Sequence, residues 1–249
     1  MSKLCIYFFH CWAISLASLG FVNIAHAHNI AHAQNSLAVF DNNYKAKLYG
    51  FSIDVTSRLT TIDDDNYEFY FKADSAIGSV TEVSKLQWNV TEQTVKPYHY
   101  SYKRRGVGKS KEDEIGFNWV EHTVDNLKTN KSLPFDSASK IQDNLSYQLQ
   151  MRQDLIAGKN NFEYAITNGR KFKKYRFEVV GEEVLQTPLG DVKTVKVKRS
   201  DANNQTVIHA WFAPSFQHLL VQLQQEENGS AYTIYLSKAV LNGKAIEHF

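Results

Sequence analysis

The sequence predicts a mainly β protein, in which an antiparallel curved sheet forms a half-open barrel or sandwich with one amphipathic helix packed against it. Three observations support this fold class. Apolar and polar residues alternate along most of the chain after residue 44, as they do in strands with one buried face. Short turn sequences separate these segments. Helical spacing is convincing only at residues 137–156. We expect about 10 to 12 strands in all.

The N-terminus has the pattern of a secretory signal peptide. Lys3 precedes an apolar run from Leu4 to Phe21, and small-residue triplets follow at 25–27 and 31–33. These features predict a signal peptide over residues 1–33, with cleavage after Ala27 or Ala33 and a periplasmic or secreted mature protein. The alternative is an uncleaved membrane anchor, since about 18 apolar residues nearly span a bilayer.

Cysteine and charge limit what the mature protein can be. Cys5 and Cys11, the two cysteines of the chain, both lie in the leader, so disulfides are not expected. Lys3 is the only charged residue before Gln34, and its removal lowers the formal net charge from +2 to +1. A near-neutral protein gives no reason to expect a nucleic-acid partner. We also expect no transmembrane span after cleavage.

The first half of the mature chain is expected to consist of hairpins. Residues 34–44 are short and polar and are interpreted as a flexible segment before a single β-rich domain at 45–249. The alternating segments around 49–55 and 67–71 flank an acidic turn at 63–66, which predicts a hairpin. Three further strands are expected within 79–90, 98–103 and 114–124.

The segment at 137–156 predicts the single helix. An apolar stripe is expected to face the sheet, while polar residues on the other faces stay in water. The stripe consists of Ala138, Ile141, Leu145, Leu149 and either Met151 or Arg152, and the polar residues are Gln142, Asp143, Gln150 and Asp154. Asp136 or Ser137 is the expected N-cap, and Gly158 is the expected C-terminal stop.

The chain after the helix predicts an antiparallel meander. Asn168-Gly169 is a strong hairpin signal, and the sequence TPLG at 187–190 fits a β-turn. Glu183 and Arg199 lie on strands that flank this second turn, so a cross-strand ion pair between them is a further expectation.

Candidate site residues come mainly from the helix. Asp143, Ser146 and Arg152 could bind a ligand head group; alternatively, they tie the helix to neighbouring strands. Sequence motifs for a serine nucleophile, a phosphate-binding loop or a metal site do not occur in the mature chain, so no catalytic residue, metal ligand or cofactor is predicted.

Two charged surface clusters are also considered. Lys103, Arg104 and Arg105 form a basic patch that could contact phosphates, although acidic residues at 112–114 could neutralise it. The acidic run 63–65 lacks the spacing of a calcium loop and is interpreted as a solvated turn.

Three runs in the second half of the chain carry a family resemblance. They are IQDNLSYQLQMRQDL, YRFEVVGEEVLQTPLGDVKTVKVKR and HAWFAPSFQHLLVQLQQEENGSAYTIYL. They resemble a family of uncharacterised periplasmic proteins of Gram-negative bacteria, catalogued as a domain of unknown function. The resemblance spans residues 45–240 and implies an exported β-rich protein without a cofactor and without an accepted catalytic residue. The matching positions include Asp143, Ser146, Arg152, Tyr175, Glu183, Arg199 and Trp211.

Within this resemblance, Tyr175 and Trp211 are interpreted as possible ligand-contacting aromatics, with Trp211 in the core or on a pocket wall. Three classes of function remain open. The first is a carrier for an apolar or lipid-like envelope molecule, by analogy with curved-sheet carriers of the periplasm. The second is an assembly factor that binds another envelope protein, and the third is a hydrolase that uses Asp143, Ser146 or a histidine.

Overall fold

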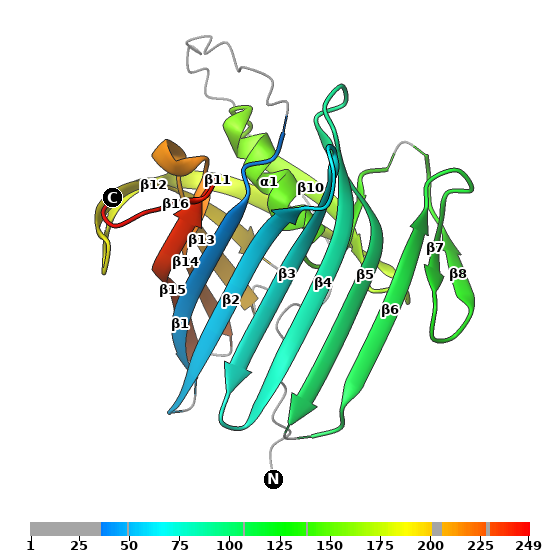
Figure 1. Cartoon of the computed structure of the whole chain (residues 1–249), viewed down its shortest axis with the longest axis horizontal. Coiled ribbons are helices and arrows are strands. Elements are labelled where there is room, and N and C mark those ends of the chain that lie inside the picture. The colour runs from blue at the N-terminus through cyan, green and yellow to red at the C-terminus, as the bar shows by residue number, and fades with distance from the viewer. Residues whose placement is uncertain (1–35, 49, 107, 138, 201–205, 228–229) are drawn as a thin grey trace.

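The computed structural model describes residues 36–48, 50–106, 108–137, 139–200, 206–227 and 230–249. The predicted signal peptide, with its cleavage positions at Ala27 and Ala33, lies outside these residues. Within them, one continuous sheet contains sixteen strands. Figure 1 shows how the labelled strands are arranged. No helix in the described ranges has the length and hydrophobicity needed to cross a bilayer.

The strands follow one another along the sheet almost in chain order. The spatial order runs from β8 back to β1, then from β15 back to β9, and β16 pairs with β15. The strands are β1 (Phe40–Leu48), β2 (Phe51–Thr61), β3 (Asn66–Ser75), β4 (Gly78–Asn89), β5 (Thr94–Gly106), β6 (Lys111–Asn118), β7 (Thr123–Asn126), β8 (Lys131–Pro134), β9 (Ile141–Gln142), β10 (Asn161–Thr167), β11 (Phe172–Thr187), β12 (Gly190–Ser200), β13 (Thr206–Ala213), β14 (Leu219–Glu227), β15 (Ser230–Leu241) and β16 (Lys244–Ala245).

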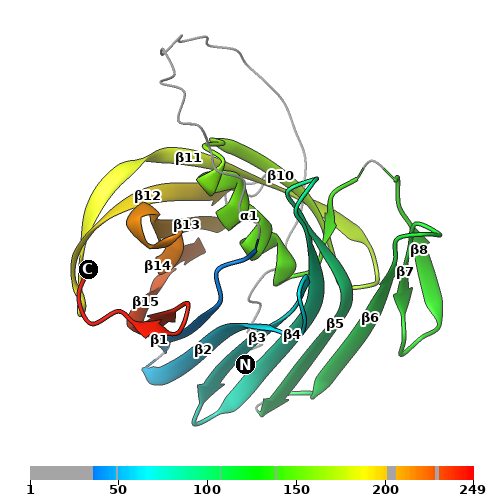
Figure 2. The ribbon, with the colours of Figure 1, turned by 45° about the horizontal axis from the view of Figure 1, so that its top comes forward.

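The pairing of β1 with β15 joins the two halves of the chain into one curved sheet. All neighbours are antiparallel except β9 and β10. The sheet curves around the helix α1 (Ser146–Ile156), and β8 and β9 are the two ends of the strand order (Figure 2). A curved antiparallel sheet with one helix was predicted and is confirmed. The expected 10 to 12 strands were too few, partly because β9 and β16 have only two residues each.

The helix is shorter than predicted, since it begins at Ser146 and not at residue 137. The expected N-caps Asp136 and Ser137 were therefore wrong. The carboxylate of Asp143 does this work instead, because its Oδ1 accepts hydrogen bonds from the backbone N–H groups of Leu145 (2.7 Å) and Ser146 (2.8 Å). Gly158 ends the helix as predicted, in the left-handed conformation at φ +74°.

The surroundings of the helix also differ from the prediction. The sheet encloses α1, so the polar residues expected to stay in water (Gln142, Asp143, Gln150 and Asp154) are all buried. Gln150 forms hydrogen bonds with β5 and with the residue before it: its Oε1 accepts from Val95 N (2.8 Å), and its Nε2 donates to Gln93 O (3.2 Å). On the opposite side, Tyr164 on β10 donates to Asp154 Oδ2 (2.8 Å). A helix inside a curved sheet needs such bonds on several faces.

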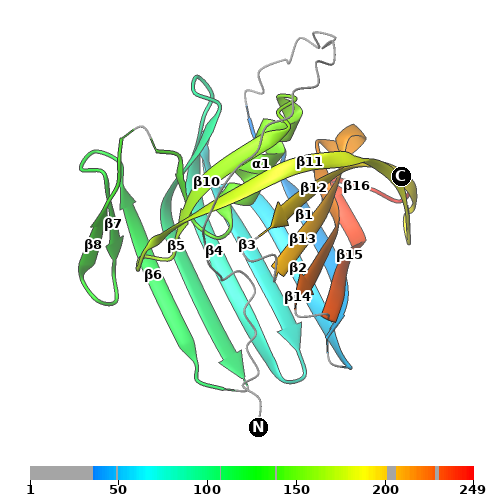
Figure 3. The same cartoon turned by 180° about the vertical axis from the view of Figure 1, so that it is seen from behind.

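The helix α1 contributes to two of the hydrophobic clusters of the core. Leu145 and Leu149 pack with aromatic and aliphatic residues of β1–β7 and β9, and Tyr147, Met151 and Leu155 pack with those of β10–β13. Figure 3, seen from behind, shows β10 and β11 crossing in front of the helix, on the side opposite the broad arm made by β1–β6. The helix therefore fills the space between two arms of the same sheet.

Three turns follow the sequence pattern closely. The acidic turn joins β2 to β3, and residues 187–190 join β11 to β12. Gly169 lies in the turn between β10 and β11 at φ +80°, and a Cβ there would approach Ile115 Cγ2 to 2.4 Å. The expectation for the start of the domain was wrong. Residues 40–44, assigned to a flexible segment, belong to β1 and pair on both sides.

Candidate ligand-binding site

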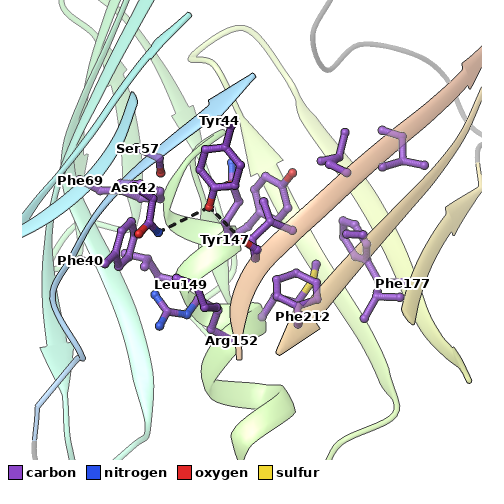
Figure 4. Close-up of a pocket in the computed structure, with 18 of the residues that line it drawn as sticks. Phe40, Asn42, Tyr44, Ser57, Phe69, Tyr147, Leu149, Arg152, Phe177 and Phe212 are labelled. Carbon is purple, nitrogen blue, oxygen red and sulfur yellow. Dashed lines mark hydrogen bonds between the residues drawn. The ribbon is translucent and has the colours of Figure 1, made fainter. Parts of the chain in front are cut away.

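A cavity of about 60 Å³ lies between α1 and the inner surface of the sheet. Its wall combines residues of β1–β3, α1 and β11–β14, so it joins both arms of the fold (Figure 4). Most of the wall is apolar, with aromatic or aliphatic side chains from every one of these elements except β2. Examples are Phe40, Phe69, Leu149, Phe177 and Phe212.

Arg152 is the main charged group from the helix in this wall, and it is only 5% exposed. Its Nε and Nη2 donate to the backbone oxygen of Gln217 at 3.3 and 3.1 Å, and its guanidinium lies 4.9 Å from the Phe40 ring centre. Among the residues that the structure describes, no carboxylate lies within 4.0 Å of Arg152. Burial lowers its pKa to about 10, so the side chain stays charged at neutral pH.

β1 contributes the other polar groups close to Arg152. Asn42 is fully buried, and its Nδ2 lies 3.5 Å from the hydroxyl of Tyr44. Its Oδ1 has no hydrogen-bond partner in the described part of the chain. Tyr44 donates to Leu220 O (3.0 Å), and burial raises the pKa of its hydroxyl. Both side chains are labelled in Figure 4, where they lie on the same side of the cavity.

A second guanidinium reaches the cavity from β12. Arg199 is 3% exposed and lines the wall, and its guanidinium lies 4.4 Å from the ring centre of Tyr175. Tyr175 itself is not among the lining residues. The structure shows a contact between Tyr175 and Arg199, and contact of Tyr175 with a ligand stays a prediction.

The structure places Asp143 and Ser146 outside the cavity wall. Asp143 Oδ2 accepts from Ser84 Oγ (2.6 Å), while Ser146 Oγ accepts from the backbone N–H of Asp143 (2.9 Å). With the two bonds to Oδ1, the carboxylate is satisfied within the protein. The structure therefore favours the interpretation in which Asp143 and Ser146 attach the helix to the sheet over the one in which they bind a ligand.

A buried acid lies beside this junction. Burial raises the pKa of Glu82 to about 7, and Tyr100 donates a short hydrogen bond to its Oε2. Asn144 Nδ2 in turn donates to the Tyr100 hydroxyl at 3.0 Å. None of these three residues lines the cavity. They form a polar network between β4, β5 and the start of α1.

Trp211 is buried but does not reach the cavity. Its Nε1 donates to the Glu183 carboxylate, and Lys196 lies both 4.8 Å from its ring centre and 3.3 Å from Glu183 Oε1. The expected ion pair between Glu183 and Arg199 was wrong, because Glu183 pairs in register with Thr194 and Arg199 with Phe177. Arg199 instead extends into the cavity.

The basic patch lies on the hairpin between β5 and β6, away from the cavity. Lys103 pairs with Glu112 at 3.3 Å, and Arg104 donates to Lys109 O at 3.0 Å. Lys103 and Arg105 are exposed. The acidic residues therefore compensate part of this patch, as considered from the sequence. Elsewhere in the described ranges, no three His, Cys, Asp or Glu residues are grouped so as to hold a metal ion.

The sequence prediction included Arg152 but missed its neighbours on β1. Phe40, Asn42 and Tyr44 alternate along one face of a strand, which is a recognisable signal. They were missed because residues 34–44 were assigned to a flexible segment. Arg199 was a matching position of the family resemblance but was assigned to an ion pair.

With this geometry established, comparisons with known proteins place the chain. A family model described as a protein of unknown function, DUF3108, matches residues 39–237. The chain belongs to the DUF3108 family. This confirms the predicted resemblance to a family of unknown function. A search of curated proteins found no match.

One solved structure shares the fold of this DUF3108 protein. It is the crystal structure of a β-barrel-like protein of a different domain of unknown function, DUF1849, from Brucella abortus. The two superpose with a TM-score of 0.55 over 83% of this chain and 98% of that one, at 8% sequence identity. At this identity the likeness concerns the fold alone.

Proposed function

We propose that this DUF3108 protein binds an apolar or lipid-like molecule between α1 and the sheet, and carries it in the periplasm. The observation that supports the proposal is the cavity beside α1, whose mainly apolar wall is supplied by both arms of the sheet. Removing apolar surface from water contributes about 0.8 kcal/mol per methylene, so an acyl chain can provide most of the binding energy.

Binding of a whole acyl chain requires the cavity to enlarge. Its volume is about 60 Å³, whereas pockets for drug-sized ligands are on the order of 300–1,000 Å³. Movement of α1 is the simplest way to enlarge the cavity, because the helix lies between the two arms and is covalently connected only at its ends. Such movement would break the bonds of Gln150 to β5 and of Asp154 to β10.

The test is native mass spectrometry of the protein purified gently from the periplasm, followed by organic extraction. A stoichiometric apolar adduct is expected, and its identification names the cargo. If the measured mass is that of the bare polypeptide, and added lipids do not bind, the carrier function is wrong. Recovery of the protein from the cytoplasm, with residues 1–33 still attached, would contradict the proposed location.

A second candidate function rests on the edge of the sheet. The strand β8 is four residues long and ends the strand order beside β7, so its outer side has no neighbouring strand among the described residues. Such an edge can bind an extended segment of another envelope protein. Crosslinking in cells, with a photoreactive residue at Ser132, would capture that partner; a carrier without a protein partner would give no specific product.

A further inference from the structure

The electrostatics of the cavity indicate the class of ligand. A buried charge normally has a partner of opposite sign, because desolvation of an unpaired ion costs several kcal/mol. Arg152 has a backbone oxygen as its hydrogen-bond acceptor and no carboxylate within 4.0 Å in the described chain. Both bonds use Nε and Nη2. A guanidinium has five N–H donors, so the two bonds leave capacity for a further acceptor.

The nearby acids do not supply this missing charge. Asp154, on the same helix, accepts from Tyr164 and pairs with Lys159 at 2.6 Å. Asp143 is occupied by the helix cap and Ser84. His218 stays neutral at pH 7, because burial and Arg152 lower its pKa to about 4.

Among the described residues, no aspartate or glutamate lines the cavity. Arg199 adds a second guanidinium to the wall, and the tyrosine hydroxyls of Tyr44 and Tyr147 stay protonated because burial raises their pKa. The wall is therefore positive as well as apolar. Asn42 Oδ1, a buried acceptor without a partner in the described residues, offers one place for a hydroxyl or amide donor.

We propose that the ligand is an anionic amphiphile, whose carboxylate or phosphate binds Arg152 while its chain lies along the apolar wall. This inference rests on the proposed function and makes it more specific. A planar guanidinium suits both acids, since it can donate two parallel hydrogen bonds to their oxygens. The ligand would supply the negative charge that the protein lacks at this position.

The test compares four probes that share one chain: decanoate, decyl phosphate, 1-decanol and decyltrimethylammonium. Their binding to the mature protein is measured by isothermal titration calorimetry at pH 7.5. We expect the better of the two acids to bind at least about tenfold more tightly than 1-decanol, because a hydrogen bond to a charged group contributes that much or more. We expect decyltrimethylammonium to bind most weakly. A preference for phosphate indicates a phospholipid-type head group, and a preference for carboxylate indicates a fatty acid.

Variants assign the preference to Arg152. Arg152→Met is expected to bind 1-decanol within about twofold of the wild type and to lose the preference for acids. Arg152→Lys keeps the charge and is expected to keep part of the preference. Arg176→Met is the matched control, because Arg176 is an exposed arginine on β11 that pairs with Glu163. It should behave as the wild type does.

The outcomes separate this inference from the proposed function. If no probe binds, both are wrong. If acid and alcohol bind the wild type equally, or Arg152→Met keeps the preference, the inference is wrong while the carrier function stands. Inorganic phosphate that binds as tightly as decyl phosphate would also overturn it. If Arg152→Met fails to fold by circular dichroism, the probe comparison on the wild type and on Arg152→Lys decides the question.

Discussion

The hydrogen bonding of buried polar groups differs between the start of α1 and the cavity beside the middle of the helix. At its start, the Asp143 carboxylate accepts three hydrogen bonds, from Ser84 and from two backbone groups. Beside the cavity, Arg152 has no carboxylate within reach, and Asn42 Oδ1 has no partner in the described residues. Satisfied polar groups stabilise a fold, whereas unsatisfied ones cost stability and are retained where a ligand uses them. The comparison therefore separates a structural junction from a candidate binding site.

The largest expected effect comes from removing the Asp143 carboxylate. Asp143→Ala should lower the free energy of unfolding by about 3 to 4 kcal/mol, since it removes a helix cap and leaves three donors without their acceptor. Urea unfolding followed by circular dichroism measures the loss, and Ser146→Ala is the milder control. Loss of ligand binding with normal stability would break the comparison, because Asp143 would then belong to the site.

Glu82 should make stability depend on pH. Burial raises its pKa in the folded protein from the ordinary 4.5 to about 7, so between these values the folded state binds more protons than the unfolded state. Stability should therefore fall as pH rises through this window, by up to about 3 kcal/mol, and be greatest at its acidic end.

Glu82→Gln tests this assignment by removing the titrating group. Its unfolding free energy, measured by urea denaturation from pH 4.5 to 8, should be flatter and should exceed that of the wild type at pH 8. Burial also raises the pKa of Asp143, so a slope of the same sign from that group will remain in Glu82→Gln. An unchanged slope in Glu82→Gln would show that another group is responsible.

A substitution at the cavity should change stability in the opposite direction to Asp143→Ala at the start of α1. Asn42→Leu removes an acceptor that has no partner among the described residues, so we expect stability to be unchanged or to rise by about 1 kcal/mol. Thermal unfolding monitored by circular dichroism gives the shift. A loss of more than about 1 kcal/mol would place Asn42 with the structural groups.

The smallest effect is expected at the basic patch. Lys103→Ala removes a solvent-exposed ion pair with Glu112, which contributes less than about 1 kcal/mol. Stability and binding of decanoate should both stay close to the wild type. A clear loss of decanoate binding in Lys103→Ala would indicate that the anion binds at the surface and not in the cavity.

Period-two alternation was enough to predict most of the sheet. It marks the hairpin around residues 63–66, and the turn signals at 168–169 and 187–190 lie where the structure places turns. These signals depend on neighbouring residues alone, so no knowledge of the rest of the chain is needed. Gly158 likewise ends the helix where the sequence indicates.

The errors lie where distant parts of the chain decide the outcome. Gln150 and Asp154 are polar residues of the kind expected on the solvent-exposed face of a helix. The sheet nevertheless buries them and supplies hydrogen-bond partners on β5 and β10. The N-terminal turns of the predicted helix became a loop and β9, because β10 offers a strand partner there. Local polarity could not show either result.

The sequence by itself therefore determined the β class, the single helix and the main turns, and it singled out Arg152, which lines the candidate cavity. Only the tertiary structure brought Asn42 and Tyr44 of β1, Arg152 of α1 and Arg199 of β12 to the same cavity. The physical reason is that alternation specifies which face of a strand is buried, while closure of β1 onto β15 and the curvature of the sheet decide which buried faces meet.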